Sequence, residues 1–116
     1  MRRLVNETRG TVVALDVEQA RGITARLKGL LGRSSLEEGH ALVIEPCTSI
    51  HTFFMKFAID VLFLNGGGLV VRALGDLRPF RATRVYPSAA LVVELPAGAV
   101  SRTSTREGDR LVFEDV

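Results

Sequence analysis

The sequence predicts a mainly β, α+β fold: an antiparallel β-sandwich or barrel-like domain with one amphipathic helix packed on it. The chain has 116 residues, close to the commonest length of a single domain, so we expect one domain over residues 1–116. Its 47% hydrophobic and 24% charged residues are typical of a globular protein and exclude a disordered, collagen-like or coiled-coil chain. Short apolar runs fill most of the sequence, and a single segment has helical periodicity.

The predicted strands are short apolar runs bounded by turn residues. A polar segment ending in Gly10 separates the first two runs, and Asn65 followed by three glycines separates two later ones, so both connections predict β-hairpins. Parallel neighbours would need a crossover, usually a helix, between successive strands, so we expect antiparallel pairing. The runs are residues 3–5, 11–15, 41–44, 50–57, 60–64, 69–74, 91–95 and 110–114.

One amphipathic helix is predicted over residues 17–31. Asp16 and Gln19 stand where an N-cap and its partner in the first turn belong, and Gly32 stands where a left-handed C-cap belongs. Charged residues occupy the other side of the helix, so one stripe should be buried against the sheets. The apolar residues at helical spacing are Val17, Ala20, Ile23, Leu27, Leu30 and Leu31.

The charge of the chain is nearly balanced. Fifteen Lys and Arg against thirteen Asp and Glu leave a net charge of +2, which does not imply a nucleic-acid partner. One local cluster is basic, with only Asp76 against it, and it is a candidate anion-binding or nucleic-acid contact. A nucleic-acid partner remains the weaker hypothesis, because such proteins normally show a stronger basic stripe. The cluster consists of Arg72, Arg78, Arg81 and Arg84.

Cysteine and histidine are scarce. A single cysteine, Cys47, rules out an internal disulfide, and with only His40 and His51 beside it the chain lacks the ligands of a structural zinc site. We therefore expect no metal and no cofactor. No apolar run has the length of a signal peptide or a membrane span, so the expected location is the cytoplasm. The oligomeric state stays open.

The densest group of chemically active residues lies in residues 46–64. A strand over residues 50–57 would be apolar on both faces and therefore covered on both. Lys56 and Asp60 would then need partners, because burying an unpaired charge is costly. We hypothesise a polar recess formed by His51, Lys56, Asp60 and Glu94, while an ion pair that pins the hairpin and general acid–base catalysis remain alternatives.

These residues support two classes of function. The leading hypothesis is a non-enzymatic domain whose recess binds a small polar ligand or a partner segment. The alternative is a hydrolase or transferase that uses Cys47 with His51, or His51 with a carboxylate. Extended backbone would hold Cys47 and His51 about 13 Å apart, so the Cys–His pair requires a turn at Thr48 and Ser49.

Several motifs occur in an order that resembles a known family. The motifs are Gly29-Leu30-Leu31-Gly32-Arg33, His51-Thr52-Phe53-Phe54-Met55-Lys56, Ile59-Asp60-Val61, Val93-Glu94-Leu95-Pro96-Ala97-Gly98 and Gly108-Asp109. This ordered set resembles the family called domain of unknown function 192. The resemblance implies a small antiparallel β-sandwich or barrel-like domain with a helix packed on it, from bacteria or archaea, without an established activity.

Overall fold

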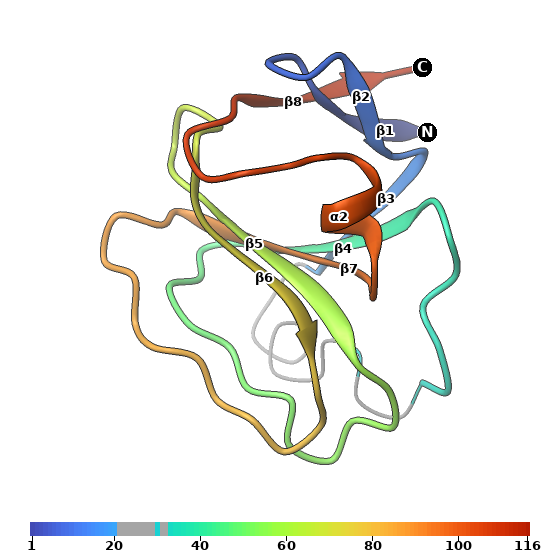
Figure 1. Cartoon of the computed structure of the whole chain (residues 1–116), viewed down its shortest axis with the longest axis vertical. Coiled ribbons are helices and arrows are strands. Elements are labelled where there is room, and N and C mark those ends of the chain that lie inside the picture. The colour runs from blue at the N-terminus through green and yellow to red at the C-terminus, as the bar shows by residue number, and fades with distance from the viewer. Residues whose placement is uncertain (21–29, 31–32) are drawn as a thin grey trace.

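Two β-sheets form the protein in the computed structural model, which describes residues 1–20, 30 and 33–116. The smaller sheet has the order β2-β1-β8 and the larger has the order β3-β4-β7-β5-β6. Figure 1 shows the smaller sheet lying across the larger one, with the short helix α2 beside the space between them. The elements are β1 (Arg2–Asn6), β2 (Thr11–Ala14), β3 (Asp16–Ala20), β4 (His40–Ile44), β5 (Ile59–Leu64), β6 (Val70–Leu77), β7 (Leu91–Pro96), α2 (Ala99–Arg102) and β8 (Leu111–Asp115).

The mainly β architecture predicted from the sequence is confirmed. Antiparallel pairing joins β1 to β2 and β8, and joins β7 to β4 and β5. Both predicted hairpins are present, β1–β2 and β5–β6. Every predicted apolar run except residues 50–57 overlaps a strand, because the patterns of these runs match sheets that are buried on one or both faces.

The predicted strand over residues 50–57 is wrong. This segment is a loop in which His51 alone forms an isolated bridge, to Ala82. The backbone cannot stay extended, because Phe54 has a φ of 65° and the Met55 N–H turns back to donate to the Thr52 carbonyl. The apolar run over residues 50–57 therefore contains exposed aromatic residues of a loop and does not form a covered strand.

The predicted start of the helix is also wrong. Asp16–Ala20 is strand β3, which pairs in parallel with β4 and places Asp16 opposite His40, so Asp16 is no N-cap. The apolar positions 17 and 20 fit a helix, but the hydrogen bonds to β4 decide the conformation. The rest of the predicted helix falls on residues 21–29 and 31–32, outside the described residues, apart from Leu30. The four-residue helix α2 was not predicted, because it is shorter than the periodicity signal.

The larger sheet separates two hydrophobic clusters. Leu62 and Leu64 of β5 belong to the cluster between the sheets, which also contains Leu4 and Leu111 of the smaller sheet. Val61 and Phe63 belong to the cluster on the opposite face. All six residues of β5 are buried, so side-chain alternation assigns each of them to one cluster or the other. This division decides which polar residues of β5 and β7 can meet.

A buried polar cluster joins the first hairpin to the loop before β8. Asp109 Oδ2 accepts hydrogen bonds from Asn6 Nδ2 (3.0 Å), Arg9 Nε (3.0 Å) and the Arg106 N–H (2.9 Å). Burial alone would raise the pKa of Asp109, but the hydrogen bonds from Arg9, Asn6 and Arg106 outweigh it and lower this pKa to about 2. The carboxylate therefore holds these two segments together as an ionised group.

Candidate functional site

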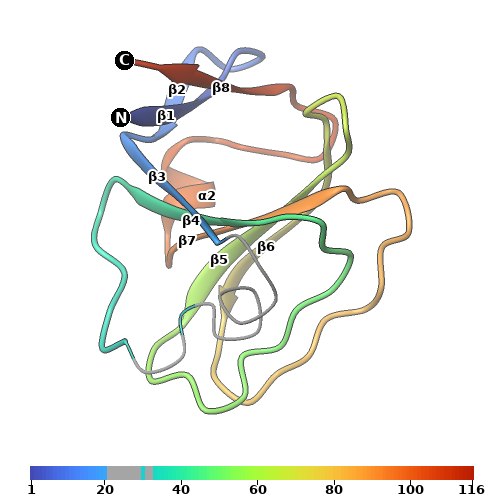
Figure 2. The same cartoon turned by 180° about the vertical axis from the view of Figure 1, so that it is seen from behind.

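Two loops on the opposite end of the molecule from the smaller sheet run side by side (Figure 2). We call residues 46–58 and 78–90 the paired loops. Backbone hydrogen bonds join them at intervals: the Thr83 N–H donates to the Ile50 carbonyl (2.9 Å), and the Tyr86 N–H donates to the Thr48 carbonyl (2.8 Å). The paired loops therefore have a defined relative position without forming a regular sheet.

Thr52 is the central residue of the contact between the paired loops. Its side chain is fully buried, and its hydroxyl donates to the Arg78 carbonyl (2.6 Å) and accepts from the Arg81 N–H (3.0 Å). Its backbone carbonyl accepts the Phe80 N–H at 3.0 Å. One threonine thus satisfies the backbone across the tight turn of the second loop.

Replacing Thr52 with valine should lower the free energy of unfolding by about 2 kcal/mol, because a buried N–H and a buried carbonyl lose their partner. Valine has nearly the same shape, so packing should change little. Chemical denaturation measures this difference. The control is Thr48→Val in the same loop, where the backbone carbonyl makes the contact to Tyr86; we expect a change below about 0.5 kcal/mol. Equal losses in both variants would contradict the role assigned to the Thr52 hydroxyl.

The paired loops expose three phenylalanines. Phe53, Phe54 and Phe80 are 41%, 75% and 56% exposed. Phe54 and Phe80 have φ values of 65° and 63°, a conformation that bulky side chains rarely adopt. Their rings meet edge to face with centroids 5.6 Å apart, and the Phe53 ring stacks on His51 at 5.2 Å. The result is an apolar patch on a backbone held in an unusual conformation.

Basic residues lie near these phenylalanines in the sequence of both loops. Lys56 follows the aromatic pair in the first loop, and Arg78 and Arg81 flank Phe80 in the second, all with exposed side chains. Residues 46–59 and 77–93 contain no Asp or Glu. We call this region the aromatic–basic surface and define it by Phe53, Phe54, Phe80, His51, Lys56, Arg78 and Arg81.

The aromatic–basic surface combines parts of two groups that the sequence analysis treated separately. It includes His51 and Lys56 of the hypothesised recess and two arginines of the basic cluster. Arg84 is exposed further along the second loop. Arg72 lies on β6, where its Nη1 is 3.0 Å from Glu107 Oε1. Among the described residues, the acidic side chain that pairs with an arginine of the surface is Asp76, whose Oδ2 lies 3.7 Å from Arg78 Nε.

Asp60 lies apart from that surface, buried on β5. Its Oδ1 accepts the Asp76 N–H (2.8 Å), and its Oδ2 accepts the N–H groups of Gly98 (3.1 Å) and Val100 (2.8 Å). Backbone N–H groups thus provide the compensation that the sequence analysis assigned to Lys56. Asp60 borders a cavity of about 420 Å³ whose walls come from β6, α2 and the loop after α2, and which contains neither His51 nor Glu94.

Glu94 lies on the other face of the larger sheet. In the β5–β7 register Asp60 is opposite Leu95, while Glu94 is opposite Val61, so the two carboxylates point to opposite sides. Glu94 is buried, and its Oε1 has no hydrogen-bond partner among the residues that the structure describes. Burial raises the pKa of Glu94 to about 7, against the lowering effect of Arg33. The structure therefore does not bring the four residues of the hypothesised recess to one place.

The Cys47 thiol and the His51 imidazole each hydrogen-bond to a backbone group two residues along the chain. The half-buried Cys47 thiol donates to the Ser49 carbonyl at 3.0 Å, and His51 Nδ1 accepts the Phe53 N–H at 3.2 Å. These contacts do not favour an activated Cys–His pair, which needs the thiol and the imidazole to hydrogen-bond each other. Within residues 1–20, 30 and 33–116, no group of three or more His, Cys, Asp or Glu is placed to hold a metal ion.

The fold and the paired loops define a small two-sheet β domain that presents an aromatic–basic surface. A family model described as uncharacterized ACR, domain of unknown function 192, matches residues 4–113. The chain belongs to this family, and the resemblance stated from its motifs is confirmed. In the part of the chain that the structure describes, no helix has the length and hydropathy needed to cross a membrane.

Relatives of this chain include archaeal UPF0127 proteins and a protein of known crystal structure. A UPF0127 protein of Thermococcus gammatolerans is 33% identical over 96% of this chain and 74% of the relative. A UPF0127 protein of Pyrococcus furiosus is 33% identical over 93% of this chain and 95% of its own length. A crystal structure of a protein of unknown function from Novosphingobium aromaticivorans has a TM-score of 0.81 at 19% identity, covering 96% of this chain and 82% of that one. These similarities establish the fold.

Proposed function

We propose that this protein is a non-enzymatic binding domain whose aromatic–basic surface receives an acidic segment of a partner protein. The observation that carries this proposal is the exposure of three phenylalanines on the paired loops, two of them at positive φ. Exposed apolar patches rimmed by polar residues are typical of interaction sites. Unusual backbone conformations also gather at such sites, where the surrounding structure maintains them.

The composition of the surface supports a protein partner. Aromatic and arginine side chains dominate the binding energy of protein–protein interfaces. Phe54 and Phe80 pack on each other, as do His51 and Phe53, so these rings form a compact apolar patch. Single-stranded nucleic acids instead need open ring faces on which successive bases stack. An apolar anchor of a partner segment fits the observed patch better.

The charge of the surface supports an acidic partner. Lys56, Arg78 and Arg81 are exposed on the same loops as the phenylalanines, and the loop segments contain no carboxylate of their own. Charge complementarity of this kind accelerates association and suppresses wrong partners. We therefore expect Asp or Glu residues on either side of a large apolar residue in the partner. His51 and Lys56 then contribute to binding, whereas Asp60 and Glu94 act in the interior.

Selection of short random peptides displayed on phage, with the purified protein as bait, tests this proposal. We expect enrichment of peptides in which acidic residues flank Phe, Leu or Trp. The synthesised consensus peptide should bind about tenfold more weakly to the double variant Phe54→Asn, Phe80→Asn. Asparagine tolerates positive φ, so this variant removes the rings and keeps the backbone. Fluorescence anisotropy measures the affinities.

Two charge-reversal variants form a matched pair for the same experiment. Arg81→Glu should weaken the consensus peptide about tenfold, while Arg106→Glu, the same change in the loop before β8, should alter affinity by less than about twofold. Enriched peptides without acidic residues, or equal effects of the two arginine variants, would overturn the proposal. Binding of a single-stranded oligonucleotide or of anionic vesicles that depends on Phe54 and Arg81, with no peptide enriched, would assign the surface to another class of partner.

A further inference from the structure

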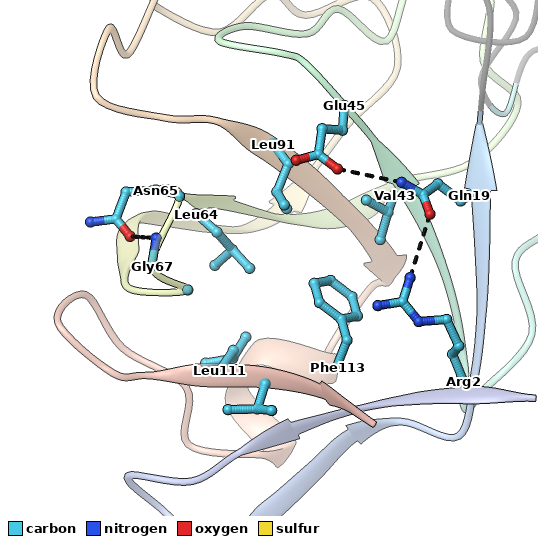
Figure 3. A pocket seen from close by; sticks show the side chains of 13 residues that line it. Arg2, Gln19, Val43, Glu45, Leu64, Asn65, Gly67, Leu91, Leu111 and Phe113 are labelled. Atoms are coloured by element: carbon cyan, nitrogen blue, oxygen red, sulfur yellow. Dashed lines mark hydrogen bonds between the residues drawn. The ribbon is translucent and has the colours of Figure 1, made fainter. Parts of the chain in front are cut away.

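A second site lies between the two sheets, away from the aromatic–basic surface. Figure 3 shows a cleft in which apolar side chains from both sheets face one another. Its volume is about 340 Å³, within the range of small-molecule sites. Val43, Leu64 and Leu91 come from the larger sheet, and Leu111 and Phe113 come from β8. The cleft therefore has apolar walls that suit the body of a small ligand.

A chain of three polar side chains lies at one end of the cleft. Arg2 Nη1 donates to Gln19 Oε1, and Gln19 Nε2 donates to Glu45 Oε1, each at 3.4 Å (Figure 3). The Arg2 guanidinium also lies 4.8 Å from the centre of the Phe113 ring. Its Nε is 3.5 Å from Oδ1 of the exposed Asp115. A cation and an anion are thus held near each other at the cleft, joined by one amide.

The strands explain why these residues face the cleft. Arg2 shares the inward side of β1 with the fully buried Leu4, whereas Arg3 points outward and pairs with Glu114 at 2.8 Å. Gln19 lies opposite Val43 in the parallel β3–β4 pair, and Glu45 follows β4 directly. Three segments that are distant in sequence therefore meet only because the two sheets pack on each other.

The other end of the cleft is a rigid wall. Asn65 Oδ1 accepts the N–H groups of Gly67 (2.9 Å) and Leu69 (3.0 Å). Gly68 has a φ of 86°, and a Cβ there would lie 2.4 Å from the Leu111 carbonyl oxygen, so only glycine fits against β8. These contacts define the conformation of the glycine turn. A ligand would therefore meet a preformed boundary.

The geometry points to a small zwitterion with an apolar body, such as an α-amino acid with an aliphatic or aromatic side chain, as the ligand of this cleft. The Gln19 amide presents its oxygen to Arg2 and its NH₂ to Glu45, in the order in which a carboxylate and an ammonium group would satisfy the same two residues. Both hydrogen bonds are longer than the usual 2.9–3.0 Å or so, and charged groups form stronger bonds than an amide. The ligand side chain would then lie against Leu91 and the half-buried Phe113.

Titration of the isotope-labelled protein, followed by NMR, tests this inference. L-leucine, L-methionine and L-phenylalanine should shift the amide signals of the cleft, at Val43, Leu64 and Leu111. Isocaproate, which lacks the ammonium group, and isoamylamine, which lacks the carboxylate, should each bind about tenfold more weakly than L-leucine. Shifts confined to other parts of the protein, or equal affinity of the three ligands, would overturn the inference.

Two variants assign the charged groups of the ligand. Glu45→Gln should remove the preference for L-leucine over isocaproate, and Arg2→Gln should remove its preference over isoamylamine. Arg3→Gln is the matched control, because its side chain lies on the outer side of β1, and it should retain the affinity for L-leucine. If Arg2→Gln and Arg3→Gln weaken L-leucine equally, or if no amino acid shifts the cleft signals, the cleft is no zwitterion site. The binding of peptides to the aromatic–basic surface is measured separately and does not depend on this result.

Discussion

Replacing Asp60 with alanine should lower the free energy of unfolding by about 4 kcal/mol. Its carboxylate accepts three backbone N–H groups, from Asp76, Gly98 and Val100. Two of them belong to the entry into α2, a four-residue helix too short to be stable without tertiary contacts. Without the carboxylate these part-buried N–H groups would lose their acceptor. Equilibrium unfolding in urea measures the loss.

Two further variants separate this role from a simple loss of volume or charge. Asp60→Asn keeps one acceptor oxygen but turns an NH₂ group toward N–H donors, so we expect a loss of about 2 kcal/mol. Asp115→Ala removes an exposed carboxylate near Arg2, and it should change stability by less than about 0.5 kcal/mol. A loss below about 1 kcal/mol for Asp60→Ala would show that the three hydrogen bonds do not hold this part of the fold.

Replacing Glu94 with glutamine should raise the free energy of unfolding by about 3 kcal/mol in mildly alkaline solution. Burial raises the pKa of this carboxyl from 4.5 to about 7, while Arg33 opposes the shift. The folded state therefore binds the proton more tightly than the unfolded state. The favourable contribution of the protonated group is full below pH 4.5 and is lost as the pH rises through about 7. Glutamine has nearly the same shape and cannot ionise.

The measurement is the free energy of unfolding as a function of pH for both proteins. The curves should lie close together at the acidic end of this range and separate as the pH rises, with the wild-type protein the less stable. Glu114→Gln is a control, because Glu114 is partly exposed and pairs with Arg3; its curve should not separate in this direction. Parallel curves for wild type and Glu94→Gln would show that folding does not change the pKa of Glu94, and would contradict this prediction.

Local patterns were sufficient for much of the larger sheet. The apolar runs and the Asn65 turn predicted the strands β5 and β7 and the β5–β6 hairpin. The same rules failed at residues 50–57 and at Asp16–Ala20. In the first case the aromatic residues are exposed, and in the second a parallel neighbour stabilises a strand where helical spacing is equally satisfied.

The candidate sites depend more strongly on contacts between distant segments. His51 and Lys56 were selected for a polar recess on a covered strand, whereas both lie exposed on a loop. Their association with Arg78 and Arg81 follows from hydrogen bonds between the paired loops, centred on Thr52. No sequence signal joined Arg2, Gln19 and Glu45. Each of these three polar residues lies next to a buried run in the sequence, and this position was the only indication that it belongs to a site.

The order of residues along the chain was enough to establish a small β-rich domain, its hairpins and its family, because those features arise from short-range alternation, turn residues and ordered motifs. Which polar groups meet was settled by the folded molecule. The β5–β7 register turns Asp60 and Glu94 to opposite faces, and the packing of two sheets brings Arg2 to Gln19. Strand register and sheet packing depend on the summed burial of many side chains from distant segments, so no local pattern specifies them.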